Sequence, residues 1–155
     1  MDTASSDDVP DLLLVINAAY EVEKFFVDGD RTDEKTIRRM MRAGVFLMAR
    51  EASGRLAGCV YVELRGERGY FGMLSVDPAL QGQGLGRRLV DAAEHYARAH
   101  GCTAMDIRVV NLRTELPPFY ERLGYVETGE VEPVDDPRAL QPFHFVTMSK
   151  PLPAD

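Results

Sequence analysis

The sequence predicts a mixed α/β fold in which helices cover a β-sheet. Its 155 residues are 45% hydrophobic, so the chain can bury a core of ordinary size as a single domain over residues 1–155. Apolar residues recur at helical spacing near the start, then switch to the shorter spacing of strands, and the two patterns alternate afterwards. No internal repeat and no linker rich in Gly, Ser or Pro divides the chain.

Two helices are expected first. Asp7 or Asp8 can cap a helix over residues 9–20, whose apolar residues form one stripe. A second, shorter helix is expected to start at Thr32, with acidic residues in its first turn, and to end at Gly44. These two helices can cover one part of the sheet.

The middle of the chain has the pattern of three hairpin-linked strands. Gly54 marks the first turn, and Gly66 and Gly69 mark the second. Asp77 and Pro78 stop the third strand. The three strands are expected over residues 45–50, 56–64 and 70–76.

The second half of the chain alternates helices and strands. Its longest helix is expected over residues 85–100, with Glu94 among the polar residues that lie outside the apolar face. Gly101 ends this helix. A strand, a short helix and two more strands follow, over residues 105–110, 115–123, 125–128 and 143–148.

The charge balance restricts the partners. The chain has 18 basic and 25 acidic residues, a net charge of −7, so it should repel a phosphate backbone, and we expect no nucleic-acid partner. Five acids and no base lie in residues 127–136. Two interpretations stay open: this stretch attracts a cationic partner such as an amine, or it is a solvated acidic loop.

Other features favour a cytoplasmic chain without a membrane partner. Cys59 and Cys102 lie far apart in apolar surroundings, which is typical of reduced core residues. The acidic N-terminus lacks a signal pattern, and the longest apolar run, near residues 12–16, is too short to span a bilayer. No cluster of histidines and cysteines has ligand spacing, so no metal is expected.

A glycine-rich loop between a strand and a helix is the strongest chemical signal. Such a loop presents unpaired N–H groups at the positive end of a helix dipole, which suits a phosphate group. Arg87 and Arg88 add positive charge nearby, although a solvated face would also explain them. A turn without a ligand remains the alternative. The loop consists of Gln81, Gly82, Gln83, Gly84, Leu85 and Gly86.

Two common phosphate-binding patterns do not fit this loop. The P-loop needs a Gly-Lys-Ser/Thr ending, which the chain lacks. The dinucleotide fingerprint needs G-x-G-x-x-G, whereas Gly82-x-Gly84 is followed directly by x-Gly86. Asp106, about twenty residues on, lies too early in its strand to reach a ribose.

The loop resembles that of the GNAT N-acetyltransferases. Gln81-x-x-Gly84-x-Gly86 matches the family's Q/R-x-x-G-x-G/A signature, which holds the pyrophosphate of acetyl-CoA. Residues 74–78 are similar to the preceding strand, Asn111 ends the following strand as asparagine often does in the family, and residues 118–125 resemble the family's helix ending. The resemblance implies a mostly antiparallel sheet of six or seven strands with four helices, and a first strand that is short or frayed.

The resemblance also implies a cofactor site and an activity. Acetyl-CoA would be the co-substrate, without a metal, and a primary amine of a small molecule, peptide or protein would attack it directly in a ternary complex. The pantetheine arm would lie along the backbone of Leu74, Ser75 and Val76, with an N–H near Val76 polarising the thioester carbonyl. The pyrophosphate would lie on Gln81 through Arg87. Asn111 would bind the arm or a water, unless it only stabilises a turn.

Tyr120 matches the family tyrosine that protonates the leaving thiolate. A phenol suits this role because it is protonated at pH 7 and has a pKa close to that of a thiol. An amphipathic core tyrosine is the alternative. An intact Tyr120 favours an enzyme over the other hypothesis, a module that senses acyl-CoA without turnover.

The general base is not identified by the sequence. The candidates are Glu23, Glu63, Glu67 and His144. Glu23 follows the first helix, near the usual acceptor pocket, and Glu63 lies near the end of a central strand and could act through a water. Each could equally be structural. Residues 17–31 and 131–141 are expected to set specificity. A different acyl donor, an oxygen nucleophile and a homodimer through the outer strands are all compatible with the sequence.

Overall fold

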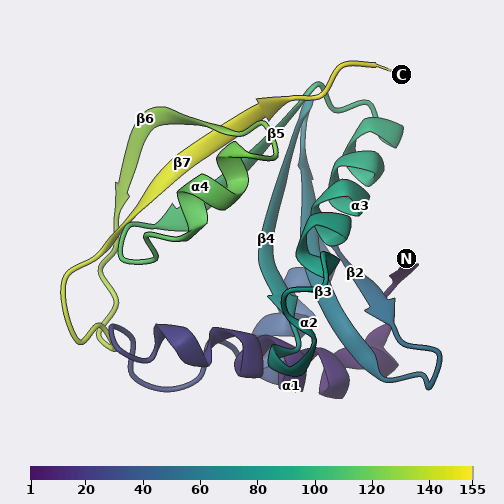
Figure 1. Cartoon of the computed structure of the whole chain (residues 1–155), viewed down its shortest axis with the longest axis horizontal. Helices are drawn as coiled ribbons and strands as arrows, with labels where there is room; N and C mark the ends of the chain where they lie inside the picture. Colours follow the sequence, from purple (N-terminus) through teal and green to yellow (C-terminus); the bar gives the residue numbers. More distant parts are fainter. Residues whose placement is uncertain (155) are drawn as a thin grey trace.

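The computed structural model describes residues 1–154 and contains a seven-stranded sheet in the order β1-β2-β3-β4-β5-β7-β6 (Figure 1). Neighbouring strands are antiparallel except β4 and β5, which run parallel and are connected through α3. The strands are β1 (Asp2–Thr3), β2 (Val45–Arg50), β3 (Leu56–Arg65), β4 (Arg68–Val76), β5 (Ala104–Val110), β6 (Val126–Pro133) and β7 (His144–Pro151).

Helices cover both faces of the sheet. α1 and α2 pack on one face around a core that includes Leu12 and Phe46, while α3 and α4 pack on the other around Leu89 and Tyr125. The mixed α/β fold, its four helices and its mostly antiparallel sheet are therefore as predicted. The helices are α1 (Val9–Ala19), α2 (Glu34–Ala43), α3 (Leu85–Ala99) and α4 (Leu116–Glu121), with 3-10 turns η1 (Ser6–Asp8), η2 (Tyr20–Glu23) and η3 (Pro78–Leu80).

The second helix begins two residues later than the sequence predicts. α2 starts at Glu34 and not at Thr32, because Asp33 is its N-cap residue. The Asp33 carboxylate accepts a hydrogen bond from the N–H of Thr36 at 2.7 Å. Thr32 lies before the cap, where its N–H donates to the Asn17 side chain at 3.0 Å. This bond ties the start of α2 to α1.

Gly69 lies within a strand and not in a turn, contrary to the prediction. β3 ends at Arg65 and β4 starts at Arg68, so the hairpin has a two-residue turn. A Cβ atom at Gly69 would lie 3.0 Å from the Cβ of Ala97 on α3. The glycine therefore serves the close approach of α3 to the sheet, which the sequence pattern does not distinguish from a turn.

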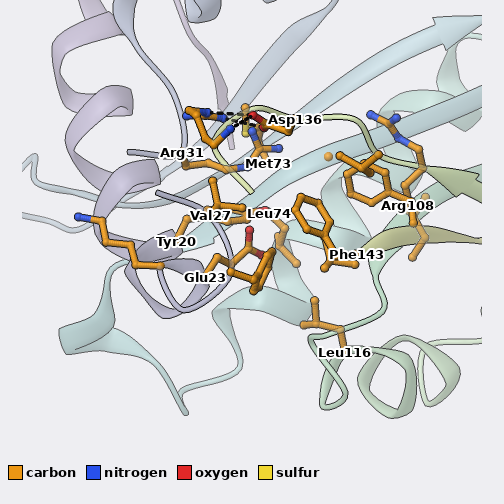
Figure 2. A pocket seen from close by; sticks show the side chains of 18 of the residues that line it. Tyr20, Glu23, Val27, Arg31, Met73, Leu74, Arg108, Leu116, Asp136 and Phe143 are labelled. Carbon is orange, nitrogen blue, oxygen red and sulfur yellow. Dashed lines mark hydrogen bonds and ion pairs between the residues drawn. The ribbon is translucent and has the colours of Figure 1, made fainter. Parts of the chain in front are cut away.

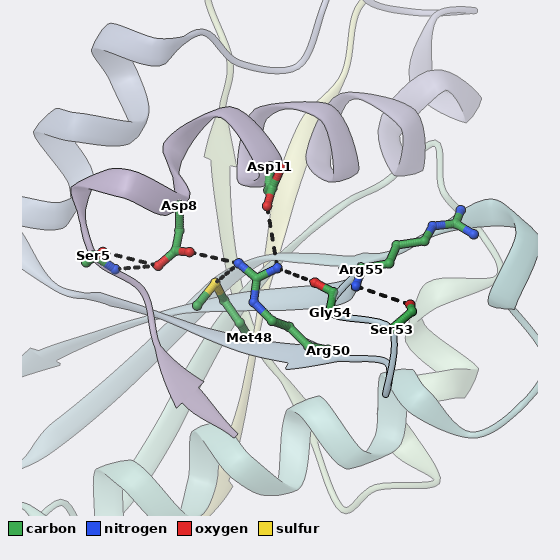
Figure 3. A network of polar contacts seen from close by, with 8 residues as sticks. All are labelled: Ser5, Asp8, Asp11, Met48, Arg50, Ser53, Gly54 and Arg55. Carbon is green, nitrogen blue, oxygen red and sulfur yellow. Dashed lines mark hydrogen bonds and ion pairs between the residues drawn. The ribbon is translucent and has the colours of Figure 1, made fainter.

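The prediction that Asp7 or Asp8 caps the first helix is only partly right. Asp8 holds the N-cap position of α1, but its carboxylate makes no capping bond (Figure 3). It accepts hydrogen bonds instead from Ser5 N–H and from Arg50, both at 2.8 Å. Arg50 also donates to the Gly54 carbonyl at 2.7 Å and reaches Asp11 at 3.4 Å. This network fixes the chain between the short β1 and α1 against β2.

Glu94 is buried, although the sequence pattern placed it outside the apolar face of its helix. Only 3% of the residue is exposed. Its carboxylate accepts hydrogen bonds from the Tyr125 hydroxyl at 2.8 Å and from Lys150 Nζ at 2.9 Å. The three groups compensate one another's burial and join α3 to β7 and to the segment after α4.

We expect Glu94→Ala to lower the free energy of unfolding by about 2–4 kcal/mol, because it leaves the Tyr125 hydroxyl and the Lys150 ammonium without an acceptor. The matched control is Asp91→Ala, at an exposed position of the same helix, which should change it by no more than about 0.5 kcal/mol. Urea unfolding measures both. Equal effects in the two variants would show that the buried contacts of Glu94 contribute nothing.

The cysteines are reduced core residues, as predicted. Cys59 and Cys102 are both free and buried, and burial raises the pKa of the Cys59 thiol to about 12. Within residues 1–154 no helix is long and apolar enough to cross a membrane. The same part of the chain holds no group of three or more His, Cys, Asp or Glu side chains placed to share a metal ion.

Candidate active site

The site begins where β4 and β5 separate (Figure 1). Their parallel pairing covers three residue pairs, from Arg68 with Ala104 to Tyr70 with Asp106. Beyond Tyr70, β4 pairs with β3 and its register with β5 ends. The second half of β4 therefore presents an open backbone edge to the gap. Such an edge can pair with an extended ligand in the way that a further strand would.

A β-bulge in β4 changes the direction of this edge. The register with β3 shifts between Cys59 opposite Ser75 and Tyr61 opposite Gly72, so two β4 residues face Val60. One of them, Met73, has a φ of 53°, which is rare for a residue other than glycine. The Ser75 hydroxyl, which is buried, donates to the Met73 carbonyl at 2.8 Å. Bulges of this kind commonly direct backbone groups into a site.

A cavity of about 220 Å³ lies in the gap between the two strands (Figure 2). Its walls come from β4, β5, η2, the start of α4 and the loops on either side, and Leu74 lines it on β4. In the view of Figure 2, Arg31 and Asp136 lie at one end and Leu116 of α4 at the other, with Glu23 between them. The site thus draws on segments from most of the chain.

The glycine-rich loop connects the end of β4 with the start of α3. Gly82 and Gly84 have φ values of +82° and +78°, and a Cβ at either would meet nothing within 4 Å. The helical hydrogen bonds of α3 start with Arg88 N–H, 3.2 Å from the Gly84 carbonyl, so the N–H groups before it are directed out of the helix end. Gln81 Nε2 donates to the Val76 carbonyl at 3.4 Å and ties the loop to β4. The loop can hold a phosphate group on backbone N–H groups.

The remaining predicted loop residues differ in exposure. Gln83 and Arg87 are exposed, so their side chains are accessible to a ligand. The side chain of Leu85 is buried in the core, which leaves its backbone alone for binding. A Cβ at Gly86 would lie 3.7 Å from Phe119 Cζ, an ordinary van der Waals distance, so the packing of α3 near α4 does not require glycine at this position.

Tyr120 lines the cavity from α4. The residue is 7% exposed, and its ring packs against Phe71, Phe119 and Tyr125 at centroid distances of 5.0–6.0 Å. Its hydroxyl has no hydrogen-bond partner among residues 1–154. Burial raises the pKa of Tyr120 well above its ordinary value, so the phenol keeps its proton. Tyr120 therefore places a protonated phenol in the wall of the cavity.

Glu23 lines the same cavity, at the end of η2. It is buried, and its Oε2 lies 2.8 Å from Nη1 of Arg113, which also contacts Glu115 at 3.1 Å. Burial raises the pKa of Glu23 above its ordinary value, while Arg113 opposes this shift. The structure brings Glu23 and Tyr120 into one cavity, although 97 positions separate them in the sequence (120 − 23).

The other predicted candidates do not line this cavity. Glu63 lies in a neighbouring hollow, where it accepts hydrogen bonds from the Tyr61 hydroxyl at 2.8 Å and from Arg65 Nε at 2.9 Å. Glu67 is exposed in the turn between β3 and β4. The Asn111 side chain accepts a hydrogen bond from the backbone N–H of His144 at 2.8 Å, which links β5 with the start of β7. The roles of these residues stay predictions.

Two loops that the sequence marked for specificity meet over the cavity. Val27 and Ala139 form an isolated antiparallel bridge, flanked by hydrogen bonds from Asp28 N–H to the Arg138 carbonyl at 2.9 Å and from Leu140 N–H to the Phe26 carbonyl at 2.8 Å. Both loops contribute to the cavity wall. We call this structure, residues 24–33 and 134–143, the roof.

Several lining residues were not predicted one by one. Arg31 and Arg138 belong to the segments that were expected to set specificity, but nothing in their spacing singles them out. Tyr20 also lies in one of these segments, whereas Tyr70 and Arg108 belong to strand patterns of the fold and reach the cavity through packing alone. Their basic or aromatic character was the available signal, and such residues are too common in the sequence to single out these positions.

Comparisons with known proteins agree with this geometry. Residues 16–149 match a family described as an acetyltransferase (GNAT) domain. A mycothiol acetyltransferase of Propionibacterium freudenreichii is 32% identical over 134 residues, which are 81% of this chain and 42% of that protein. Glucosamine 6-phosphate N-acetyltransferase 1 of Oryza sativa is 39% identical over 83 residues, 49% of this chain and 48% of that protein. The chain thus spans less than half the length of these two relatives.

Solved structures share the fold at low sequence identity. The ribosomal-protein-S18-alanine N-acetyltransferase of Escherichia coli superposes with a TM-score of 0.81 at 17% identity, covering 99% of this chain and 94% of that one. A ribosomal-protein-alanine N-acetyltransferase of Brucella melitensis gives 0.78 at 18% identity, covering 97% and 98%. These similarities extend over the whole sheet and both helical layers.

Proposed function

The chain belongs to the GNAT acetyltransferase family, and on this premise we propose that it transfers the acetyl group of acetyl-CoA to a primary amine by direct attack in a ternary complex. The acceptor amine is on a small molecule, a peptide or a protein. One observation carries the proposal: the open edge of β4 and a protonated tyrosine line one cavity, and the glycine-rich loop that can hold a phosphate group follows β4 after one short 3-10 turn.

The residues present suit acetyl-CoA. An extended pantetheine arm can pair with the open backbone edge over Leu74, Ser75 and Val76, as a strand would. The pyrophosphate can lie on the N–H groups from Gln81 to Arg87, where two positive-φ glycines leave the backbone uncovered. The acetyl group would then lie between β4 and β5, next to the cavity.

The chemistry requires a neutral amine, a stabilised oxyanion and a proton for the thiolate. The amine nitrogen attacks the thioester carbonyl carbon, and a backbone N–H near Val76 stabilises the oxygen that becomes negative. Collapse forms the amide and breaks the C–S bond. Tyr120 donates its proton to the departing sulfur, and Glu23 takes up the proton that the amine releases, which balances the reaction.

The activity can be tested in two steps on one sample. Calorimetric titration with acetyl-CoA and CoA measures cofactor binding, and release of CoA thiol in the presence of an amine panel measures transfer. Binding together with amine-dependent thiol release supports the proposal. Binding without release from any amine would favour an acyl-CoA sensor, and failure to bind either ligand would overturn the proposal.

We expect Glu23→Gln to lower kcat/KM at pH 7 by about 10²-fold or more, because the amine loses its proton acceptor. Burial raises the pKa of Glu23, so the active carboxylate form of the wild type is lost as the pH falls through that raised value. The wild-type pH profile should therefore have an acid limb set by Glu23, whereas the activity of the variant should rise only at alkaline pH, where the amine deprotonates by itself.

Glu63→Gln is the matched control for this prediction. Glu63 was the other sequence candidate, and Arg65 beside it lowers the pKa of its carboxyl, so it should remain ionised over the same range. We expect the wild-type profile in this variant. If Glu63→Gln removes the acid limb and Glu23→Gln keeps it, the two assignments must be exchanged.

A further inference from the structure

The lining of the cavity carries an excess of cations, although the chain as a whole carries a charge of −7. Four cations and two anions are among the lining side chains. The balance is notable because an acidic protein would be expected to surround an amine site with carboxylates. These charged lining residues are Lys24, Arg31, Arg108, Arg138, Glu23 and Asp136.

All but one of these charges are already paired. The acidic stretch at residues 127–136 supplies the carboxylates that pair with two of the lining arginines. The two lining carboxylates are themselves each paired with an arginine. The pairs are Lys24 with Glu21 at 2.9 Å, Arg108 with Glu132 at 3.1 Å, Arg138 with Asp136 at 3.3 Å, and Arg113 with Glu23 at 2.8 Å.

Arg31 is the exception. Among residues 1–154, no carboxylate oxygen lies within 4.0 Å of a guanidinium nitrogen of Arg31, the distance limit for an ion pair. The side chain is held by the ring of Tyr20 instead, with Cζ 5.1 Å from the ring centroid. Figure 2 shows it at the roof end of the cavity, near Asp136, whose carboxylate is engaged by Arg138. Arg31 therefore presents a positioned positive charge with free donors to whatever enters.

We propose that the acceptor is an amine that also carries an oxyanion, a carboxylate or a phosphate, and that Arg31 binds this group. The inference rests on the proposed acetyl transfer and names its substrate class. Arg31 lies at the opposite end of the cavity from Leu116 of α4, and α4 carries Tyr120, with Glu23 between the two ends (Figure 2). The amine would thus reach Glu23 and Tyr120 while the anionic group pairs with Arg31.

Tyr20 fits the space between these two functions. Its phenol lies within electrostatic range of both Arg31 and Glu23, and burial raises its pKa to about 12, so it adds no negative charge. Its ring provides an apolar surface along which the body of a small acceptor can pack. The guanidinium has the planar donor geometry that binds carboxylate or phosphate through two hydrogen bonds.

Matched pairs of acceptors test this inference in the thiol-release assay. Phenylalanine is compared with phenylalaninamide, and 2-aminoethyl phosphate with ethanolamine, so each pair differs in its anionic group. We expect kcat/KM to be higher for at least one anionic member by about 10- to 100-fold, the effect of a charge-assisted hydrogen bond. The pair that shows the preference distinguishes a carboxylate from a phosphate.

Arg31→Gln should remove this preference. We expect KM for the preferred anionic amine to rise by about tenfold or more, with KM for its neutral counterpart and for acetyl-CoA unchanged. Arg42→Gln, at an exposed position in the last turn of α2, is the matched control and should behave as the wild type. Equal or better use of the neutral amines by the wild type, or an equal loss for both members in Arg31→Gln, would overturn the inference.

Failure of the proposed function would look different. If acetyl-CoA binds but no amine is acetylated, the transfer itself is in question, and the anion site is then tested by binding. Phenylalanine and 2-aminoethyl phosphate are added to the CoA complex, and the Tm is measured. A rise with either probe in the wild type but not in Arg31→Gln would support the anion site, and no rise would overturn it.

Discussion

Tyr120→Phe should lower kcat by about 10²- to 10⁴-fold, the usual contribution of a general acid, and leave acetyl-CoA affinity unchanged. The reason is local. The hydroxyl has no partner within the described chain, while the ring packs against Phe71, Phe119 and Tyr125. Phenylalanine keeps those ring contacts, so the variant loses the hydroxyl that we propose as proton donor and little else. Steady-state thiol release gives kcat, and calorimetric titration gives the affinity for acetyl-CoA.

Tyr125→Phe is the matched control, because it removes a hydroxyl from the same aromatic cluster. That hydroxyl is bound to buried Glu94 at 2.8 Å and does not line the cavity. The control should lower the free energy of unfolding by about 1–2 kcal/mol and keep kcat. Tyr120→Phe should instead lower kcat and leave the free energy of unfolding nearly unchanged. A Tyr120→Phe enzyme with normal kcat would assign the tyrosine to the core alone.

The pH dependence gives a second check on Tyr120. Burial raises its pKa, so the phenol should stay protonated through neutral and mildly alkaline pH, and its deprotonation should not limit the wild-type rate there. An alkaline limb near the pKa of an ordinary phenol would contradict the buried environment described for this residue.

Gly84→Glu should weaken the binding of acetyl-CoA by about 10²- to 10⁴-fold, which corresponds to losing about two charge-assisted hydrogen bonds. Gly84 is the N-cap residue of α3, with a φ of +78°, at the end of the helix where N–H groups are directed outward. A carboxylate there would occupy the anion site and repel the pyrophosphate. Calorimetric titration with CoA measures the loss directly.

The strain of the substitution has to be separated from its charge. Gly101→Glu is suited to this, since Gly101 follows the other end of α3, has a φ of +87° and likewise has nothing within 4 Å of an added Cβ. Both variants should lose about 1–2 kcal/mol of stability through the left-handed backbone. Only Gly84→Glu should lose cofactor binding. Loss of binding in both would indicate general damage to α3 and would refute a specific anion site.

The elements and the position of the glycine-rich loop were predictable because their signals are local. The spacing of apolar residues distinguishes α3 from β5 within a few turns, and Gly101 and Gly124 mark helix ends by their own chemistry. The structure places the glycine-rich loop, Gln81-x-x-Gly84-x-Gly86, between a strand and a helix, as the spacing of apolar residues predicted. Such features depend on neighbours along the chain, so a sequence contains them in full.

Errors occurred where a local pattern has two structural meanings. Gly69 looked like a turn residue but makes room for Ala97, and Glu94 looked like a surface residue but binds Tyr125 and Lys150. In both cases the contact that decides the position of the residue is made with a residue at least 28 positions away in the chain. The shortest of these separations is between Gly69 and Ala97 (97 − 69). Neither the glycine nor the glutamate carries a sign of that distant partner.

The sequence by itself determined the fold class, the order of its elements and the place of the glycine-rich loop, and it singled out the tyrosine that we propose as proton donor. Only the tertiary structure decided where β4 and β5 separate, that Glu23 and not Glu63 shares the cavity with Tyr120, and that the roof brings Arg31 to it. The physical reason is that a helix, strand or turn is specified by residues close together in the chain. A cavity, its charge and its unpaired groups arise from the packing of segments that the sequence holds far apart.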